Sequence, residues 1–317
     1  MRFNPLEYSI CLEAPLRIKL SNWQQHIPFA MFLVAAAKPR VIVELGTQYG
    51  DSYCAFCQAV RALALDTRCY AVDNWQGDAH SGYYGPEVLA DLRVHHDPLY
   101  ADFSTLMEKT FDDALHEFKD GTIDLLHIDG LHTYDAVSHD LHAWLPKMSD
   151  VGIMLLHDIN IYEHDFGVWR LWNEITQLYP CFAFNHGYGL GVAAVGVDVP
   201  DAVRSLFEAD HRDAATIQRY FQALGEREFV RRVKFLEEGI VGIDRRNVAL
   251  EAEGASYGEH IGKVEEAVQE LRGRVDAVED ELSRVRRGRA IGLPSWVRRL
   301  PGVPLRSEDE GLGSRRA

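Results

Sequence analysis

Two apolar runs that each end in a carboxylate place the strongest constraint on what this chain can fold into. They are LLHIDGLHTYD at residues 125–135 and IMLLHD at residues 153–158. The segment between them has apolar side chains at helical spacing, which predicts a strand, helix, strand unit. Asp129 and Asp158 then lie at the carboxyl ends of two neighbouring buried strands, where open α/β sheets bind ligands. Together with His132 they can hold a divalent cation or perform acid/base chemistry.

The rest of the first 200 residues shows the same alternation of strands and helices. We expect strands at 41–45, 69–73, 103–107, 123–128 and 153–157, with helices at 23–37 and 52–65. This order is typical of a mostly parallel sheet. A further helix is expected at 166–178. After it, the apolar runs 181–185 and 190–196 are joined by His186-Gly187-Tyr188-Gly189, which predicts an antiparallel hairpin.

Composition limits the classes of partner and the compartment. The chain has 317 residues and a formal net charge of −15, carried almost entirely by residues 1–250. Such an acidic folded part argues against nucleic acid as the principal partner. The five cysteines lack framework spacing and no secretion signal is evident, so we expect a cytoplasmic protein. Cys54 and Cys57 are expected to pack in the core, and no apolar run is long enough for a transmembrane segment.

The C-terminal part follows a different pattern. Apolar residues between Ile261 and Val285 alternate at spacings of three and four, which is a heptad seam. We therefore divide the chain into residues 1–200 with an N-terminal helical lead-in, a helical extension at 201–254, a coiled coil at 255–287 and a disordered basic tail at 288–317. Opposite charges beside the seam favour a parallel homo-oligomer through residues 261–285, either dimer or trimer. The alternative is that the seam folds back onto the first 200 residues.

A glycine turn follows the first strand. Glu44-Leu45-Gly46 and Gly50 do not match the dinucleotide fingerprint G-x-G-x-x-G, because only two glycines occur and they lie four apart. An acidic strand end followed by such a turn suits a cationic nucleoside that bears an amino acid. Asp73, at the end of the next strand, is placed to accept hydrogen bonds from both ribose hydroxyls. A purely structural role for the pair is the alternative.

Four stretches together carry a family resemblance: VIVELGTQYGDSY, CYAVDNWQGDAHSGYYG, the run from Ile123 to Asp158, and DFGVWRLWNEI. They resemble the S-adenosylmethionine-dependent methyltransferases of the class I fold, whose sheet is mostly parallel and ends in an antiparallel hairpin. Within this fold they look most like the branch with the macrocin and sugar O-methyltransferases and the cephalosporin-biosynthesis methyltransferase-like proteins. The likeness covers roughly residues 20–200. Its most specific element is D-G-x-H-x-Y followed by H-D.

The resemblance implies how the methyl donor is bound. By position in the shared motif, Glu44, Gly46, Gly50 and Ser52 would cradle the methionine part of S-adenosylmethionine. Asp73 would bind its ribose. The segment E-L-G-x-x-x-G-x-S is also similar to that of catechol O-methyltransferase, which supports the inclusion of Ser52.

The same carry-over implies a metal site. Asp129 and Asp158 would bind a divalent cation, Mg²⁺ or Mn²⁺, and His132 would be the general base. Macrocin-type relatives have Glu-Asp where this chain has His157-Asp158. Because Mg²⁺ prefers oxygen ligands, His157 is either an unusual third ligand or a side chain packed beside the site.

These expectations define a function and two rivals. The function is cytoplasmic, metal-assisted O-methylation of a hydroxyl on a sugar, glycan or glycosylated metabolite. A nicotinamide-dependent oxidoreductase is disfavoured by the missing third glycine and by the terminal hairpin. A catalytically weak scaffold that assembles a glycan-modifying complex through its coiled coil is the other rival. The polar and aromatic stretch 74–86 is either a lid that contacts substrate or an ordinary ordered loop. As a lid it would contact substrate through Asp78, His80, Tyr83 or Tyr84.

Overall fold

The computed structural model describes residues 4–19, 21–251 and 258–289, which form two compact units divided between Arg232 and Val233. The first unit contains a sheet of seven strands in the order β5-β2-β1-β6-β7-β9-β8. Five neighbouring strands are parallel, and β9 runs antiparallel to both β7 and β8. The bounds are β1 (Val41–Leu45), β2 (Arg68–Asp73), β5 (Ser104–Glu108), β6 (Ile123–Ile128), β7 (Met148–His157), β8 (Cys181–Phe184) and β9 (Leu190–Ala194). The expected mostly parallel sheet with a terminal antiparallel hairpin is confirmed.

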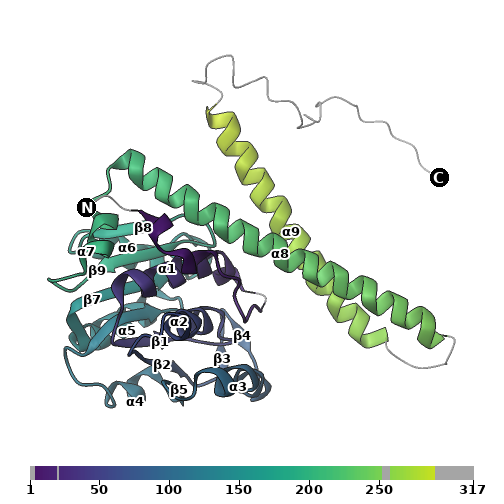
Figure 1. Ribbon diagram of the computed structural model, residues 1–317, viewed down its shortest axis with the longest axis horizontal. Coiled ribbons are helices and arrows are strands. Elements are labelled where there is room, and N and C mark those ends of the chain that lie inside the picture. Colours follow the sequence, from purple (N-terminus) through teal and green to yellow (C-terminus); the bar gives the residue numbers. More distant parts are fainter. Residues whose placement is uncertain (1–3, 20, 252–257, 290–317) are drawn as a thin grey trace. The chain divides into compact units, whose positions relative to one another are not determined.

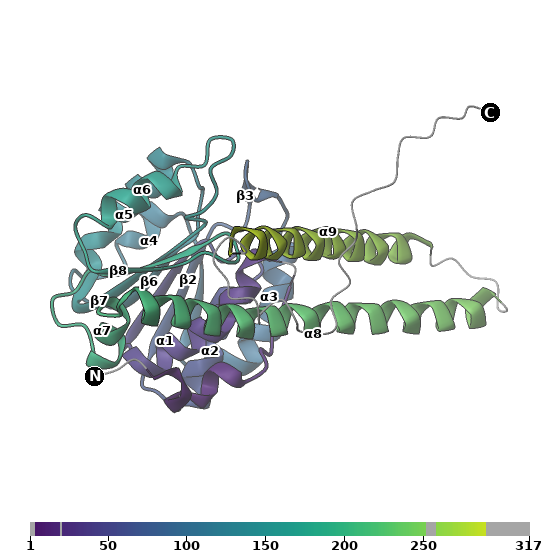
Figure 2. The ribbon, with the colours of Figure 1, turned by 90° about the horizontal axis from the view of Figure 1, so that it is seen from above.

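Helices cover both faces of this sheet (Figures 1 and 2). One face is covered by α1 (Ile27–Ala37), α2 (Asp51–Ala62), α3 (Glu87–Tyr100) and α7 (Asp201–Phe207), and the other by α4 (Phe111–Leu115), α5 (Tyr134–Trp144) and α6 (Val168–Ile175). The short elements are η1 (Pro5–Glu7), η2 (Ser9–Leu12), η3 (Asn22–His26), η4 (Leu145–Lys147), β3 (Gly77–Asp78) and β4 (Gly82–Tyr83). The expected helix at 23–37 is thus a 3-10 turn followed by α1.

Helix α5 shows how the sequence directs the chain past the site. The Thr133 hydroxyl accepts a hydrogen bond from the backbone N–H of Ala136, which caps the first turn. Val137, Leu141 and Trp144 are buried on one face of the helix, against the sheet. This packing fixes the position of α5 relative to β6. It therefore also fixes the position of the connecting loop, which carries His132.

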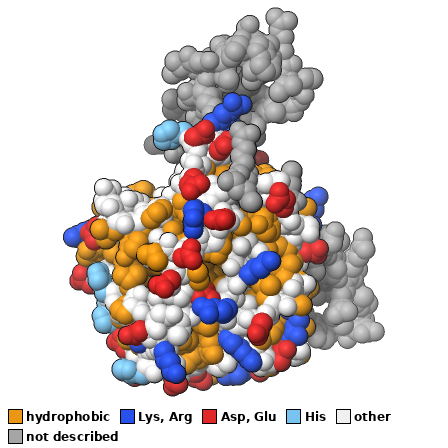
Figure 3. Space-filling model, turned by 60° about the vertical axis from the view of Figure 1, so that its left-hand side comes forward, with side chains coloured by type: hydrophobic (Ala, Val, Ile, Leu, Met, Phe, Trp, Pro, Cys, Tyr) orange, Lys and Arg blue, Asp and Glu red, His pale blue; other side chains and the backbone are white. Residues whose placement is uncertain are grey.

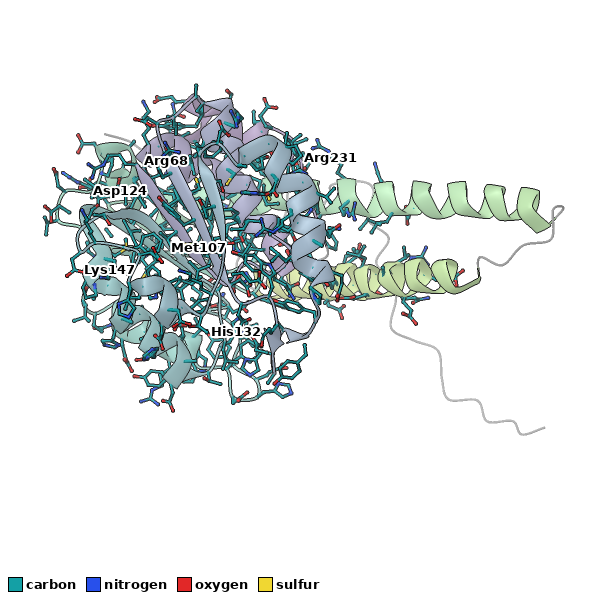
Figure 4. All side chains as sticks on the ribbon, turned by 90° about the horizontal axis from the view of Figure 1, so that it is seen from below. Arg68, Met107, Asp124, His132, Lys147 and Arg231 are labelled. Atoms are coloured by element: carbon teal, nitrogen blue, oxygen red, sulfur yellow. The ribbon has the colours of Figure 1, made fainter. Side chains whose placement is uncertain are left out.

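The register of the strands aligns the expected site residues along the carboxyl edge of the sheet. The pairs across neighbouring strands are Leu45–Val72, Leu45–Ile128 and Ile128–Leu156. The residues that follow these positions therefore emerge together at the carboxyl edge of the sheet. In Figure 4, Asp124 near the start of β6 and His132 just past its end lie at opposite edges of the sheet.

The second unit consists of the end of α8 (His211–Glu251), which begins in the first unit, together with α9 (Gly258–Arg289). Glu237 of α8 and Arg272 of α9 form an ion pair of 4.0 Å, so α9 runs back alongside α8. Val268 and Leu271 of the heptad seam are buried within the single chain. Residues 290–317, most of the expected tail, lie outside the described residues.

Figure 3 shows a face on which acidic and basic side chains are interspersed among hydrophobic ones. Among the described residues, no helix combines the length and apolar character that crossing a membrane requires.

Candidate active site

The site is centred where the strand order reverses, between β1 and β6. Gly46 follows β1 with a φ of 86°, and a Cβ at this position would overlap the carbonyl group of Asp129. The backbone N–H of Asp129 donates to the carbonyl of Leu45 at 2.9 Å. Only glycine allows the two loops to approach this closely. Ligands of open α/β sheets bind in the crevice at such a reversal, so Gly46 and Asp129 mark its floor.

Asp73 holds the glycine turn in shape. One of its carboxylate oxygens accepts hydrogen bonds from the backbone N–H groups of Thr47 and Gln48, at 2.9 and 2.8 Å. The other accepts from the backbone N–H of Trp75 at 2.7 Å. Burial raises the pKa of Asp73 above its ordinary value, although these three bonds oppose that shift. Since a carboxylate has about four acceptor positions, one remains for a ribose hydroxyl.

The N-terminal arm also holds this turn, which sequence reasoning missed. The buried Arg17 guanidinium donates to the carbonyl of Tyr49 at 2.6 Å and pairs with Asp91 at the same distance. Two residues later, the Lys19 backbone N–H donates to the carboxylate of Asp51 at 2.5 Å. Because these partners lie far apart in the sequence, no local pattern indicates the contact.

Gly50 and Ser52 begin helix α2 at the end of the turn. Gly50 has a φ of 81°, and a Cβ there would overlap the side chain of Leu92. Ser52 is buried in the first turn of the helix. Both residues lie where the glycine turn enters α2, and their expected contact with the donor stays a prediction.

The Glu44 side chain bonds to a residue of the neighbouring strand β6. It lies directly opposite His127 in the register of β1 and β6, and its carboxylate is 2.8 Å from Nδ1 of that imidazole. The indole N–H of Trp23 donates to Nε2 of His127 at 3.0 Å. An indole can only donate, so Nε2 is the acceptor and the Nδ1–H of His127 donates to Glu44. Glu44 is fully buried, and its other carboxylate oxygen has no hydrogen-bond partner among the described residues, so its expected contact with the donor stays a prediction.

Two carboxylates and two imidazoles meet past the ends of β6 and β7. Nε2 of His132 lies 3.0 Å from Asp158 and 3.4 Å from Asp129. Nδ1 of His157 lies 3.2 Å from Asp158 and 3.3 Å from Asp129. Asp158 has a φ of 61°, an uncommon conformation for a residue with a side chain and one that recurs at functional sites. The structure therefore brings together every expected metal-site residue and the expected base.

The residues of this cluster shift one another's pKa values. Burial would lower the pKa of His132, but its hydrogen bonds to Asp129 and Asp158 outweigh that effect and raise it to about 10. His157 follows the same logic, and the charges of the two carboxylates raise its pKa to about 9. Burial would raise the pKa of Asp129, but the charge of His157 and the bonds to both imidazoles lower it overall. These pKa shifts favour the charged forms of Asp129, His132 and His157.

The orientation of His157 fits a metal ligand. Its Nε2 lies 2.9 Å from the carbonyl oxygen of Gly187 and therefore carries the hydrogen, which directs Nδ1 toward the two carboxylates. Metal-binding histidines usually donate their other N–H in this way. Two ligands held at about 2.1 Å from one ion and at right angles are about 3 Å apart, close to the observed spacing. Asp129, His132 and Asp158 also present donor atoms within 4.8 Å of one another. These residues fit a divalent cation.

Comparisons with known proteins agree with this architecture. Residues 43–159 match a family model described as a methyltransferase domain, a segment that runs from β1 past Asp158. The uncharacterized protein y4gI of Sinorhizobium fredii (strain NBRC 101917 / NGR234) is 46% identical over 186 residues, which are 59% of this chain. The match covers 20% of that relative, so the chain spans about a fifth of its length.

Solved structures give a more distant likeness. A putative O-methyltransferase from Klebsiella pneumoniae is 18% identical, with a TM-score of 0.42 over 61% of this chain and 88% of that one. The S-adenosylhomocysteine-bound methyltransferase PaMTH1 of Podospora anserina is 15% identical, with a TM-score of 0.42 over 53% of this chain and 76% of that one. The family model is the stronger finding. Residues 43–159 are therefore similar to a methyltransferase domain, as the sequence motifs predict.

Proposed function

We propose that the protein transfers the methyl group of S-adenosylmethionine to a hydroxyl of a sugar, glycan or glycosylated metabolite, assisted by a divalent cation. The observation that carries this proposal is the shared edge of the sheet. There the glycine turn at Gly46 touches the backbone of Asp129, whose side chain belongs to the carboxylate and imidazole cluster. A donor lying along the turn would reach the cluster with its reactive end. The match of residues 43–159 to a methyltransferase domain supports this donor.

The choice of acceptor is supported by the sequence motif. D-G-x-H-x-Y at residues 129–134 followed by H-D at 157–158 resembles the branch with macrocin and sugar O-methyltransferases. Both halves of the motif meet in one cluster, through His132 and Asp158 at 3.0 Å. We therefore propose the sugar-modifying branch over other O-methyltransferases.

The chain's own residues supply binding and proton transfer. An alcohol is a poor nucleophile, so its hydroxyl must be held in line with the methyl group and lose its proton as the bond forms. The hydroxyl oxygen forms the new bond to the methyl carbon, while the carbon–sulfur bond breaks and its electron pair stays on sulfur. A cation held by Asp129, Asp158 and His157 would lower the pKa of the hydroxyl. His132 can receive the proton only in its neutral form, with its hydrogen on Nε2 toward Asp158. Its Nδ1 is then an open acceptor, because this atom is buried and lacks a hydrogen-bond partner among the described residues.

A labelled-donor assay tests this function. We expect protein incubated with methyl-labelled S-adenosylmethionine, Mn²⁺ and a panel of simple glycosides to form methyl ethers, and a chelator to stop the reaction. Asp158→Asn should lower the rate by at least about a hundredfold, since it removes a charged ligand. Asp112→Asn is the matched control, because Asp112 pairs with His139 at 2.8 Å on the exposed surface. Turnover that survives both the chelator and Asp158→Asn would refute cation assistance.

A further inference from the structure

A small hairpin carries a third imidazole to this cluster. Strands β3 and β4 pair antiparallel, Gly77 opposite Tyr83 and Asp78 opposite Gly82. At its tip the Asp78 carboxylate accepts hydrogen bonds from the backbone N–H groups of His80 and Ser81, at 2.7 and 2.8 Å. These bonds fix the backbone from which the His80 side chain projects.

The His80 ring lies next to His132 of the carboxylate and imidazole cluster. It stacks on Phe166 with ring centres 4.4 Å apart and an interplanar angle of 12°. The ring of His132 stacks on the same Phe166 at 4.9 Å, and the two imidazole centres are 5.5 Å apart. Phe166 is itself fixed, because it pairs with Thr133 in a β-bridge and the next residue, Gly167, donates its N–H to the carbonyl of His132 at 2.8 Å.

One nitrogen of His80 has a partner and the other does not. Nε2 lies 2.8 Å from the carboxylate of Asp165, so Nε2 carries the hydrogen and donates it. In the neutral ring Nδ1 is then a bare acceptor. This atom is buried, the side chain is 8% exposed, and Nδ1 has no hydrogen-bond partner in the part of the chain that the structure describes. A buried polar atom without a partner is costly, so its retention beside the cluster indicates a ligand.

We propose that His80 contacts the acceptor and that its Nδ1 accepts a hydrogen bond from an acceptor hydroxyl. This inference rests on the proposed function. Asp165 orients the ring, and Phe166 stacks against both His80 and His132. The contact fixes how the acceptor lies against Asp129 and Asp158. The β3–β4 hairpin is thereby part of the acceptor site.

Two variants separate the hydrogen bond from the stacking. His80→Phe keeps an aromatic ring on Phe166 and removes both nitrogens. His80→Asn places an amide near the position of Nδ1 and removes the ring. The probe is methyl α-D-mannopyranoside, titrated into the full chain with S-adenosylhomocysteine and Mg²⁺ and followed by NMR of ¹⁵N-labelled histidine side chains. His139→Phe is the matched control, because His139 also pairs with an aspartate but lies on the exposed surface.

The expected results are specific to the contact. In the unmodified protein Nε2 of His80 carries the hydrogen, and the probe shifts the Nδ1 resonance. His80→Phe weakens binding of the probe by about five- to tenfold, as loss of one hydrogen bond predicts. His80→Asn weakens it less, and His139→Phe leaves it unchanged. Binding of S-adenosylhomocysteine stays the same in all variants.

Any of three results would overturn the proposal: a hydrogen on Nδ1 of His80, no binding of the probe to the unmodified protein, or binding of the probe that His80→Phe leaves unaltered. Failure of the proposed function has a different signature, because the unmodified protein would then bind no S-adenosylhomocysteine in the same samples.

Discussion

Nε2 of His157 lies 2.9 Å from the carbonyl oxygen of Gly187, so the turn between β8 and β9 sets the direction of this imidazole. Nε2 of His26 lies 3.1 Å from the same carbonyl oxygen. The terminal hairpin therefore completes the sheet and also orients a residue of the carboxylate and imidazole cluster. This relationship makes Nδ1 of His157 the atom to test.

Two amide substitutions distinguish the nitrogens of His157. His157→Gln keeps a polar group near the position of Nε2 and loses Nδ1, whereas His157→Asn keeps one near Nδ1. We expect Mn²⁺ affinity, measured by calorimetry, to fall by about 10- to 100-fold in His157→Gln and by less in His157→Asn. Because imidazole suits Mn²⁺ better than Mg²⁺, the unmodified protein should prefer Mn²⁺. Equal affinities in the two variants and the unmodified protein would make His157 a packing residue.

Binding of a cation should release protons. His132 and His157 have pKa values of about 10 and 9 in the folded chain, so both carry protons at pH 7.5 that a cation must displace. Affinity for Mn²⁺ should therefore rise as pH increases from 7 toward 9. Calorimetry in buffers of different ionisation enthalpy should find between one and two protons released per ion at pH 7.5. Binding without proton release would show that the imidazoles are already neutral.

Asp73 should affect both the donor and the fold. Asp73→Ala leaves the N–H groups of Thr47, Gln48 and Trp75 without their acceptor, at a cost of roughly 1–3 kcal/mol for each buried group. We expect affinity for S-adenosylhomocysteine to fall at least about tenfold, with a lower melting temperature. Asp73→Asn keeps the shape and should lose less of both. If calorimetry finds unchanged affinity in Asp73→Ala, Asp73 does not bind the donor.

The heptad seam of α9 should govern assembly separately from catalysis. Val268 and Leu271 are buried within the single chain, whereas Val275 and Val278 are half-buried and remain for association. We propose that a chain lacking residues 255–317 forms a smaller species in light scattering and still binds S-adenosylhomocysteine. An unchanged oligomer would place the interface within residues 1–254.

The sequence predicted those parts of the site that depend on strand ends. Apolar runs set the extent of β6 and β7, and parallel pairing then requires Asp129 and His157 to emerge together. The hairpin of β8 and β9 followed from two apolar runs around a glycine-containing turn. These features come from periodicity and local turn chemistry, which a single sequence contains.

Other parts depended on partners that periodicity does not specify. Glu44 lies opposite His127 in the register and bonds to it, a contact that the sequence did not predict, and its expected contact with the donor stays a prediction. His80 was only one of several candidates in a polar stretch, because strands of two residues leave no period to read. Arg17 reaches Tyr49 from an arm that precedes the first strand. Such contacts are set by packing between distant segments.

The most direct test of the account is one calorimetric series with the unmodified chain and Asp158→Asn. The account predicts a single S-adenosylhomocysteine site in both proteins and a Mn²⁺ site in the unmodified chain alone, because Asp158 belongs to the cation cluster and not to the donor turn. An unmodified chain that binds no S-adenosylhomocysteine, or an Asp158→Asn variant that binds Mn²⁺ as tightly as the unmodified chain, would contradict it.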